Sequence, residues 1–554
     1  MRVRPRSLLL AVAAGVALAD GSIVTLALPE ILQELDTTVE GVAAVIGVYT
    51  VVLAVALLPL ERAASAWSVR AIGAGGLLLM AIASLACAAA DDLTGLLVAR
   101  AAQGLGGAAG LVAAFAVLGG GAVRGRALWL AAAVLGTAIG PALGGALTEL
   151  FSWQAIFVFQ APVAAAAALA MLAGPAPAHL VTPAVPEPHG RFGRRPALAL
   201  GLVSAALSAV LFLLVLLLVA GWSVSPLGAA AAVTVIPLAA LAGTRIGGEP
   251  HVRAAAGCAL VAGGVLALAW VPEAHIAWTL APQALAGAGM GLALPALAGG
   301  LLPEHTVHDA ARTLAVRHAG IALALVALAP IVAGQLEAST HRAQEQGVAL
   351  VLDAPFDPQE KLALAPALLS GVDEQDPRAG LRRALAAERG RFSGEDLRAY
   401  DRLAQRADET LTAAVADAFQ EAFLITGALA LLAALVVAPW PPPRRVLPAL
   451  GAAGALAIGA PAAYAAAHAA LAPEPVEIQD PCKANRDLPG TGGVGGFLQD
   501  RGLQLLDATA CQLGASREEL VLALSDPAEA RRFKERHGVD PRSVGGLLQV
   551  LLGG

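Results

Sequence analysis

Two residues of opposite charge stand well inside apolar stretches of the first part of the chain. Asp20 lies about 13 residues after Ser7, and Arg100 lies about 7 residues after Leu93. A buried charge costs free energy, so an ionisable residue in such a stretch is a candidate functional group. A carboxylate favours its protonated form when it is desolvated and its charged form when it is paired with a guanidinium. The two residues therefore predict a proton-binding pair; the alternative is a static salt bridge that fixes helix packing.

Four uncharged polar residues stand in other parts of the apolar stretches. Gln103 lies one helical turn from Arg100 on the same face and could hydrogen-bond to Arg100 or to a substrate. The other three are Tyr49, Gln160 and Gln283. We take all four as candidate residues of a substrate cavity, with packing between helices as the alternative.

The apolar stretches are long enough to cross a membrane, which takes about 20 residues in a helix. The chain has 554 residues, of which 57% are hydrophobic and only 14% charged, and its mean hydropathy is +0.71. A soluble protein carries about 25% charged residues, so the composition predicts an all-α polytopic membrane protein. Thirteen stretches are long enough, at residues 7–29, 42–60, 71–90, 93–122, 127–148, 154–177, 197–220, 224–244, 254–272, 276–302, 313–335, 419–440 and 446–471.

The first stretch could also be a secretory signal, because it follows a basic segment and contains a cleavage-like Ala17-Leu18-Ala19. The apolar residues resume after Asp20 and continue to Pro29. We therefore predict a retained first span.

The charges between the spans alternate in sign along the chain. With the N-terminus in the cytoplasm, each cytoplasmic loop contains arginine, whereas the short outer loops contain acidic residues and no Lys or Arg. Positive charge resists translocation and so sets topology. The pattern predicts a multi-pass protein of the cytoplasmic (plasma) membrane, with a cytoplasmic N-terminus and an extracytoplasmic C-terminus.

A longer loop after the sixth span divides the first twelve spans into two sets of six. Helical spacing of apolar residues also predicts a small helical cap between spans 11 and 12, and a helical bundle in the tail. The predicted organisation is an N-terminal six-helix half (1–178), a cytoplasmic linker (179–196), spans 7–11 (197–336), an extracytoplasmic helical insertion (337–418), span 12 (419–440), an extra span 13 (441–471) and an extracytoplasmic helical tail (472–554).

Four cysteines are present, and only Cys482 and Cys511 lie outside the spans. Both belong to the tail, on the predicted oxidising side of the membrane. We expect a disulfide between them, with two free thiols as the alternative.

A run of small residues in the fifth span places Gly136, Gly140 and Gly144 on one helix face, next to Pro141 and Gly145. Such a face lets helix backbones approach closely, and a proline is tolerated there. The run resembles the glycine–proline motif of drug:proton antiporters of the major facilitator superfamily. A close helix contact without a role in transport is the alternative.

Five further segments resemble the same superfamily, in particular its larger, 14-span drug:proton antiporter branch. The resemblance covers about residues 7–440 and implies a transporter with two six-helix halves, in which Asp20 and Arg100 take part in proton coupling. The segments are residues 20–29 in span 1, the R-x-x-Q-G motif at 100–104 in span 4, the tryptophan-led 153–157 with Pro162 in span 6, the glycine-rich 287–295 in span 10, and 317–320 at the start of span 11.

Two features depart from that branch. Its extra pair of spans in the middle is absent, and the additional span here is at the end. The loop between spans 2 and 3 lacks the expected leading glycine, although Glu61, Arg62 and Arg70 could still form a weaker latch at the cytoplasmic gate.

The second half contains no acidic residue within a span. Recognition of a fixed charge is therefore not expected there, and a broad apolar cavity suits amphiphilic compounds. His318 is expected near the cytoplasmic end of span 11, in contact with solvent.

The sequence thus predicts a proton-coupled antiporter that exports amphiphilic or drug-like compounds by alternating access. The alternatives are an exporter of a lipid or glycolipid for envelope assembly and a non-transporting membrane sensor or scaffold. The expected partners are the small substrate, protons, the lipid bilayer and an extracytoplasmic protein bound through 472–554. We expect no enzyme activity, cofactor, metal site or nucleic acid.

Overall fold

The computed structural model describes residues 5–119, 123–173, 193–301, 306–357, 359–361, 364, 377–483 and 493–543. These residues form helices and connecting turns without a β-strand, which confirms the all-α class. Most of the predicted linker (179–196), part of the predicted insertion and the end of the tail lie outside the described ranges.

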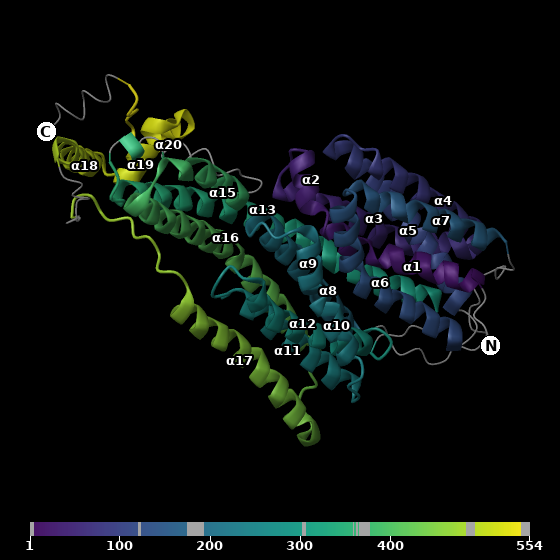
Figure 1. Cartoon of the computed structure of the whole chain (residues 1–554). Coiled ribbons are helices and arrows are strands. Elements are labelled where there is room, and N and C mark those ends of the chain that lie inside the picture. Colours follow the sequence, from purple (N-terminus) through teal and green to yellow (C-terminus); the bar gives the residue numbers. More distant parts are fainter. Residues whose placement is uncertain are drawn as a thin grey trace. The chain divides into compact units, whose positions relative to one another are not determined.

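Figure 1 shows the helices of the first half, two of which, α3 and α4, begin at polar side-chain caps. Thr38 accepts a hydrogen bond from the backbone N–H of Gly41, and Ser68 accepts one from that of Ala71. Each cap satisfies an N–H group that has no partner inside its helix. The helices are α1 (Pro5–Thr25), α2 (Leu28–Glu34), α3 (Val39–Ala66), α4 (Val69–Ala88), α5 (Leu93–Gly119), α6 (Val123–Leu150) and α7 (Gln154–Leu172).

The second half contains a π-helical segment and one broken span. The π-segment η1 (Leu216–Gly221) continues α8, and Thr234 separates α9 from α10 within one apolar stretch. The α-helices of the spans from the seventh onward are α8 (Arg194–Val215), α9 (Pro226–Val233), α10 (Val235–Gly243), α11 (Pro250–Leu268), α12 (Ile276–Leu297), α13 (Val307–Asp353), α16 (Gly394–Val437) and α17 (Leu447–Leu471).

Twelve helical segments among the described residues are long and apolar enough to cross a membrane. Each of them overlaps one of the thirteen predicted spans, and the remaining predicted span, 127–148, lies within α6. The count of spans from apolar length therefore agrees with the helices of the structure.

Helix pairing repeats between the two halves. In the first half α5 packs against α3 and α4; in the second half α12 packs against α10 and α11. The fourth span of each half therefore contacts the second and third spans of the same half. The additional helix α17 packs against α11.

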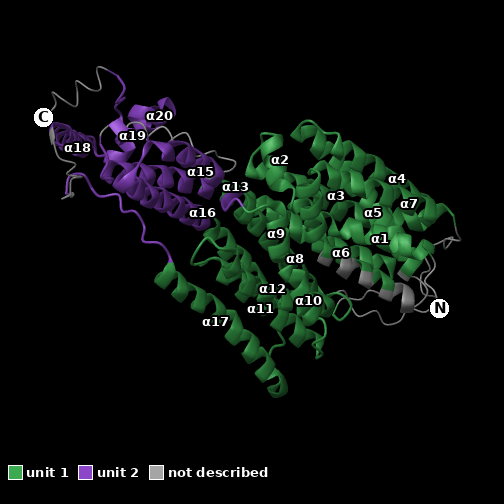
Figure 2. Cartoon of the chain, in the orientation of Figure 1, with its two compact units in different colours: residues 1–219, 224–334, 419–471 green, residues 220–223, 335–418, 472–554 purple. Residues whose placement is uncertain are grey.

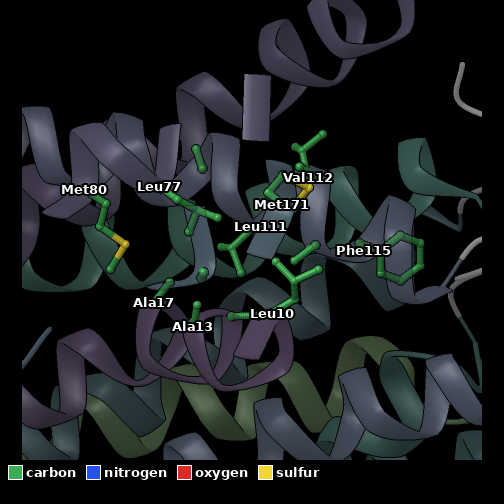
Figure 3. Packing of buried hydrophobic residues seen from close by; sticks show 14 of the residues in the cluster. Leu10, Ala13, Ala17, Leu77, Met80, Leu111, Val112, Phe115 and Met171 are labelled. Atoms are coloured by element: carbon green, nitrogen blue, oxygen red, sulfur yellow. The ribbon is translucent and has the colours of Figure 1, made fainter. Parts of the chain in front are cut away.

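The first half has an apolar core to which α1, α3, α4, α5, α6 and α7 all contribute side chains. Figure 3 shows side chains from α1, α4, α5 and α7 meeting in this cluster, including Leu10, Leu77, Leu111 and Met171. Lipid is as apolar as these side chains, so the core is held by close packing rather than by exclusion of water.

The chain forms two compact units (Figure 2). Unit 1 comprises residues 1–219, 224–334 and 419–471, and unit 2 comprises 220–223, 335–418 and 472–554. The long helices α13 and α16, of 47 and 44 residues, contribute to both. The insertion is thus partly built from extensions of span helices, because the Ala-, Gln- and Glu-rich residues after the apolar stretch also favour helix.

Unit 2 has its own core of aromatic and apolar side chains. Phe392 lies between Phe356 and Tyr400, with ring centroids 5.2 and 4.6 Å apart. The Tyr400 hydroxyl donates to the carbonyl of Leu385, and burial raises the pKa of Tyr400 to about 12. The other helices of the unit are α15 (Pro377–Glu388), η2 (Arg389–Arg391), α18 (Gly493–Leu513), α19 (Arg517–Ser525) and α20 (Pro527–His537).

Within unit 2, polar contacts join the tail to the end of α13. His341 lies 3.4 Å from Glu345 and 3.0 Å from Glu529 of α20. Burial raises the pKa of Glu345, and the charge of the neighbouring His341 opposes this shift. Arg517, which is buried, contacts Asp353 at 2.9 Å. The insertion and the tail are therefore one folded unit and not two separate caps.

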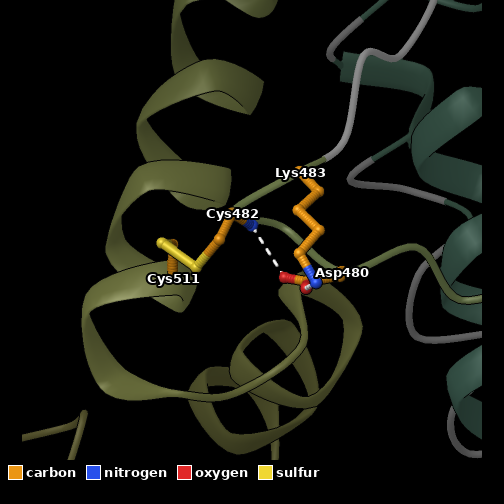
Figure 4. The surroundings of a disulfide bond; sticks show 4 residues. All are labelled: Asp480, Cys482, Lys483 and Cys511. Atoms are coloured by element: carbon orange, nitrogen blue, oxygen red, sulfur yellow. Dashed lines mark hydrogen bonds and ion pairs between the residues drawn. A yellow bond between two sulfur atoms is a disulfide. The ribbon is translucent and has the colours of Figure 1, made fainter.

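The predicted disulfide between Cys482 and Cys511 is present (Figure 4). Asp480 accepts a hydrogen bond from the backbone N–H of Cys482 and lies 3.3 Å from the ammonium group of Lys483. The bond joins the segment that precedes α18 to α18 itself. It closes a loop of 29 residues.

We expect replacement of both Cys482 and Cys511 by Ser to make the tail more sensitive to limited proteolysis. In the chain-entropy model a loop of this length stabilises the folded state by about 3–4 kcal/mol. Cleavage rates of the full-length protein, with and without reductant, measure the effect. The matched control replaces the buried free thiols Cys87 and Cys258; equal tail cleavage in all forms would contradict the expectation.

Candidate functional site: a buried ion-pair network beside a central cavity

Asp20 of α1 and Arg100 of α5 form a fully buried two-bond ion pair. The Nη1 and Nη2 atoms of Arg100 donate to Oδ1 and Oδ2 of Asp20 at 3.0 and 2.6 Å. Both side chains are 0% exposed. In a low-dielectric interior such a pair is stable only when its remaining donors and acceptors are also satisfied.

Two further polar residues, Gln103 and Gln160, close this ion pair into a ring, and a third, Ser84, bonds to it. Arg100 Nη1 donates to Gln103 Oε1 at 2.6 Å, and Gln103 Nε2 donates to Gln160 Oε1 at 2.7 Å. Gln160 Nε2 then donates to Asp20 Oδ1 at 3.0 Å. Gln103 Nε2 also donates to Ser84 Oγ at 2.9 Å. Helices α1, α4, α5 and α7 thus share one buried network, in which each bond polarises the next.

Arg100 also contacts the backbone and two aromatic rings. Its Nε donates to the carbonyl of Val45 at 2.9 Å. The guanidinium carbon lies 4.5 Å from the ring centre of Tyr49 and 5.6 Å from that of Phe157. The Tyr49 hydroxyl donates to the carbonyl of Ala17 at 2.8 Å. Cation–π contacts stabilise a guanidinium that has left water.

The network has two chemically distinct states. With Asp20 charged, the carboxylate accepts bonds from Arg100 and Gln160. With Asp20 protonated, it loses its charge and gains one O–H donor, so the attraction to Arg100 falls and the ring of bonds must rearrange. A proton on Asp20 would therefore weaken the contacts that hold α1 against α5 and α7.

The glycine face of α6 meets α1 directly. A Cβ atom at Gly136, Gly140 or Gly144 would overlap Gly15, Ser22 or Ile23 of α1, respectively. A Cβ at Gly145 would instead overlap Ala230 of α9. The predicted motif thus places α6 against the helix that holds Asp20 and against the second half of the chain. Pro141 lines the cavity between them.

A cavity of about 100 Å³ lies between the two halves within unit 1. Residues of α1, α3 and α6 line one side, and residues of α8, α9, α10, α12 and α13 line the other. It is smaller than the 300–1,000 Å³ typical of a pocket for a drug-sized ligand, so the halves must separate before such a molecule can enter.

The structure places the four predicted cavity residues differently from one another. Tyr49 lines the cavity and stacks on Arg100. Gln103 and Gln160 are buried in the ion-pair network. Gln283 of α12 is also buried, and its Nε2 donates to Thr279 Oγ1 at 2.9 Å while its Oε1 has no partner.

The predicted gate residues lie near the end of α3 and the start of α4. Glu61 Oε2 is 3.1 Å from Nδ1 of His308, at the start of α13, and so links the two halves. Arg62 is exposed and Arg70 is partly buried. Sequence reasoning missed His308, which was visible only as a polar residue in the loop before span 11.

Sequence reasoning also misplaced Arg317 and His318. Helix α13 begins at Val307, because Thr306 accepts a hydrogen bond from the backbone N–H of Asp309 and caps it. Arg317 and His318 are therefore about 15 Å along the helix, and both line the central cavity. The second half thus places a cation at the cavity, which a search for acidic residues within its spans did not reveal. The Thr306–Asp309 capping pattern was the signal for the earlier helix start.

Comparisons with known proteins agree with this arrangement. Residues 10–329, more than half of the chain, match the family model described as Major Facilitator Superfamily. The chain is 32% identical over 152 residues to multidrug resistance protein Stp of Mycobacterium tuberculosis, a match that covers 26% of this chain and 28% of the relative. It is 31% identical over 169 residues to methylenomycin A resistance protein of Bacillus subtilis, covering 29% of this chain and 36% of the relative. These matches span only about a third of the relatives' own length.

The fold is similar to a solved transporter structure. It matches the crystal structure of a bacterial homolog to the human lysosomal transporter Spinster, in its inward-facing and occupied conformation, with a TM-score of 0.54 and 16% identity. The match covers 78% of this chain and 95% of the other. Family match, helix pairing and fold together show that this chain belongs to the major facilitator superfamily.

Proposed function

We propose that this protein is a proton-coupled antiporter that exports amphiphilic or drug-like compounds across the cytoplasmic membrane. The observation that carries the proposal is the closed, fully buried network around Asp20 and Arg100 beside a cavity between the two halves. Relatives named for multidrug and antibiotic resistance support the substrate class.

Tyr49 offers the physical link between the proton site and the cavity. Its ring lies against the guanidinium of Arg100 and also lines the cavity, and its hydroxyl holds the backbone of α1 at Ala17. A substrate that displaces Tyr49 therefore perturbs Arg100. Conversely, a proton on Asp20 releases Arg100 and changes the position of Tyr49, so the two ligands compete through one set of contacts.

Alternating access then follows from the helix that joins the halves. Because α6 contacts α1 through Gly136, Gly140 and Gly144, a shift of α1 on protonation is transmitted to α6. Gly145 transmits it across the interface to α9. The two halves rock about the central cavity as in other transporters built from repeats.

The test is proton movement in energised inside-out vesicles, reported by a pH-sensitive dye, with a panel of amphiphiles of different charge. An exported compound added outside these vesicles should release protons from their acidic interior. Asp20→Asn should remove this response, whereas the control Glu40→Gln, at an exposed residue in the first turn of α3, should retain it. A folded wild-type protein that responds to no compound would exclude antiport and favour the sensor or scaffold alternative.

We expect His308→Ala and Glu61→Gln to lower the transport rate by a similar factor of about two to five, without loss of folded protein. Their pair is partly exposed, and such pairs contribute about 1 kcal/mol or less. The double variant should be no slower than either single variant, because both changes remove one contact. Additive losses would show that the two residues act separately.

A lipid or glycolipid exporter for envelope assembly is the second candidate. The observation that favours it is unit 2, in which the disulfide-linked tail packs with the insertion into one folded body. In that case, full-length protein cross-linked in cells should capture an envelope protein through 472–554. Deletion of this tail should stop export without loss of proton coupling.

A further inference from the structure

Arg317 is a cation without a counter-ion in the central cavity. It lies on α13, is half-buried and lines the cavity. Among the described residues the structure gives its side chain neither a hydrogen bond nor an ion pair. By contrast, Arg100 donates hydrogen bonds to Asp20, to Gln103 and to the carbonyl of Val45. An arginine held inside a membrane protein without a partner raises the free energy of the folded state. A ligand that pairs with the guanidinium removes this cost.

A second unsatisfied group lies on the same side of the cavity, on α8. Ser204 of α8 is 3% exposed, lines the same cavity, and its Oγ has no hydrogen-bond partner. A buried hydroxyl without a partner destabilises the folded state, because its hydrogen bonds to water are lost and not replaced. His318 also lines the cavity, and its Nδ1 donates to the carbonyl of Leu314 at 2.8 Å. Its Nε2 therefore remains for a ligand.

Among the residues that the structure describes, no carboxylate lines this cavity. The nearest acidic group named in the site, Asp20, has both oxygens bonded by Arg100 and Gln160. Apolar side chains also line the cavity, with Leu207, Leu211 and Leu294 among them, beside further hydroxyl groups such as that of Ser208. The cavity thus combines a cation and hydroxyl groups with an apolar wall.

We infer that Arg317 and Ser204 form the recognition site for the oxyanion head of an amphiphilic substrate, such as a carboxylate or a phosphate monoester. A guanidinium binds either group through two parallel hydrogen bonds, and a serine hydroxyl adds a third donor. The apolar wall accepts the hydrocarbon part. This inference rests on the proposed transport function and specifies its substrate class: anionic amphiphiles are preferred to cationic ones.

The inference is tested by binding, without a proton gradient. Purified full-length protein in dodecyl maltoside is titrated with radiolabelled decyl phosphate, and unlabelled decanoate, decanol and decyltrimethylammonium compete. The four compounds share one chain length and differ in the head group. The wild type should prefer the two anions by about tenfold or more, since a charge-assisted pair contributes more than a neutral hydrogen bond.

The variants separate recognition from folding. Arg317→Gln should remove the anion preference, Arg317→Lys should retain part of it, and Ser204→Ala should weaken binding of both anions. Arg245→Gln, an exposed arginine in the α10–α11 loop, is the matched charge control. Arg317→Gln should also leave the thermal unfolding temperature unchanged or higher, because it removes a charge without a partner, whereas loss of a structural arginine would lower it.

The outcomes distinguish this inference from the proposed function. Equal affinity for all four compounds, or an anion preference that survives Arg317→Gln, would overturn the inference while leaving proton antiport intact. Anion binding that depends on Arg317, together with absence of substrate-driven proton movement in vesicles, would overturn antiport and leave the binding site in place.

Discussion

Asp20→Asn is expected to abolish substrate-driven proton movement and to destabilise unit 1. The asparagine keeps the size of the carboxylate but removes its charge, so Arg100 is left buried without a counter-ion. Loss of one partner from a buried ion pair costs about 3–5 kcal/mol. The thermal unfolding temperature of the purified protein reports the stability, and dye-based proton movement in inside-out vesicles reports the coupling.

The double variant Asp20→Asn/Arg100→Gln separates a proton site from a static salt bridge. It leaves no unpaired charge, and the two amides can still hydrogen-bond with Gln103 and Gln160. We therefore expect the unfolding temperature to recover toward the wild-type value. Proton movement should stay absent, because no titratable group remains in the network. Coupled transport by the double variant would mean that the pair only fixes helix packing and that protons bind elsewhere.

Much of the ion-pair network could be predicted from the sequence. An acid and a base within apolar stretches, at similar depth in the membrane, have few partners other than each other. Gln103 follows from helical spacing, since it is one turn from Arg100. Gln160 was found only as a polar residue in a span. Its contact with Asp20 joins residues 140 positions apart and depends on which face of the Ala-rich helix α7 turns inward, which such a uniform helix does not reveal.

The state of Arg317 could not be predicted in this way. An apolar stretch counted from residue 313 places Arg317 near the membrane surface, where a charge is ordinary. The actual start of α13 at Val307 moves it inward. Whether Arg317 has a partner depends on the side chains of all the helices that surround it. The sequence does not show which residues those are, and the structure does. The same is true of the long extensions of α13 and α16, because a helix need not stop where its apolar residues do.

Gly144→Ala is expected to reduce transport strongly by moving α1 away from α6. The new methyl group would overlap the carbonyl oxygen of Ile23, so the backbones must separate. Ile23 is one turn from Asp20, and a displacement of about 1 Å at a functional group can cost about a hundredfold in rate. Transport rate per folded protein and the unfolding temperature should both fall. Gly47→Ala and Gly75→Ala are matched controls, since a Cβ atom at either position meets no atom within 4 Å.

Gly145→Ala should give a different result, because its Cβ would overlap Ala230 of α9, across the interface of the two halves. In the proposed alternating-access cycle that interface opens, whereas the α1–α6 contact stays within one half. The substitution therefore disfavours the state in which the halves are closed here, and should slow turnover with a smaller loss of unfolding temperature than Gly144→Ala. Substrate binding to the protein at equilibrium should persist, since Gly145 does not line the cavity. Equal losses of stability and turnover in both variants would show that the glycine motif serves static packing alone.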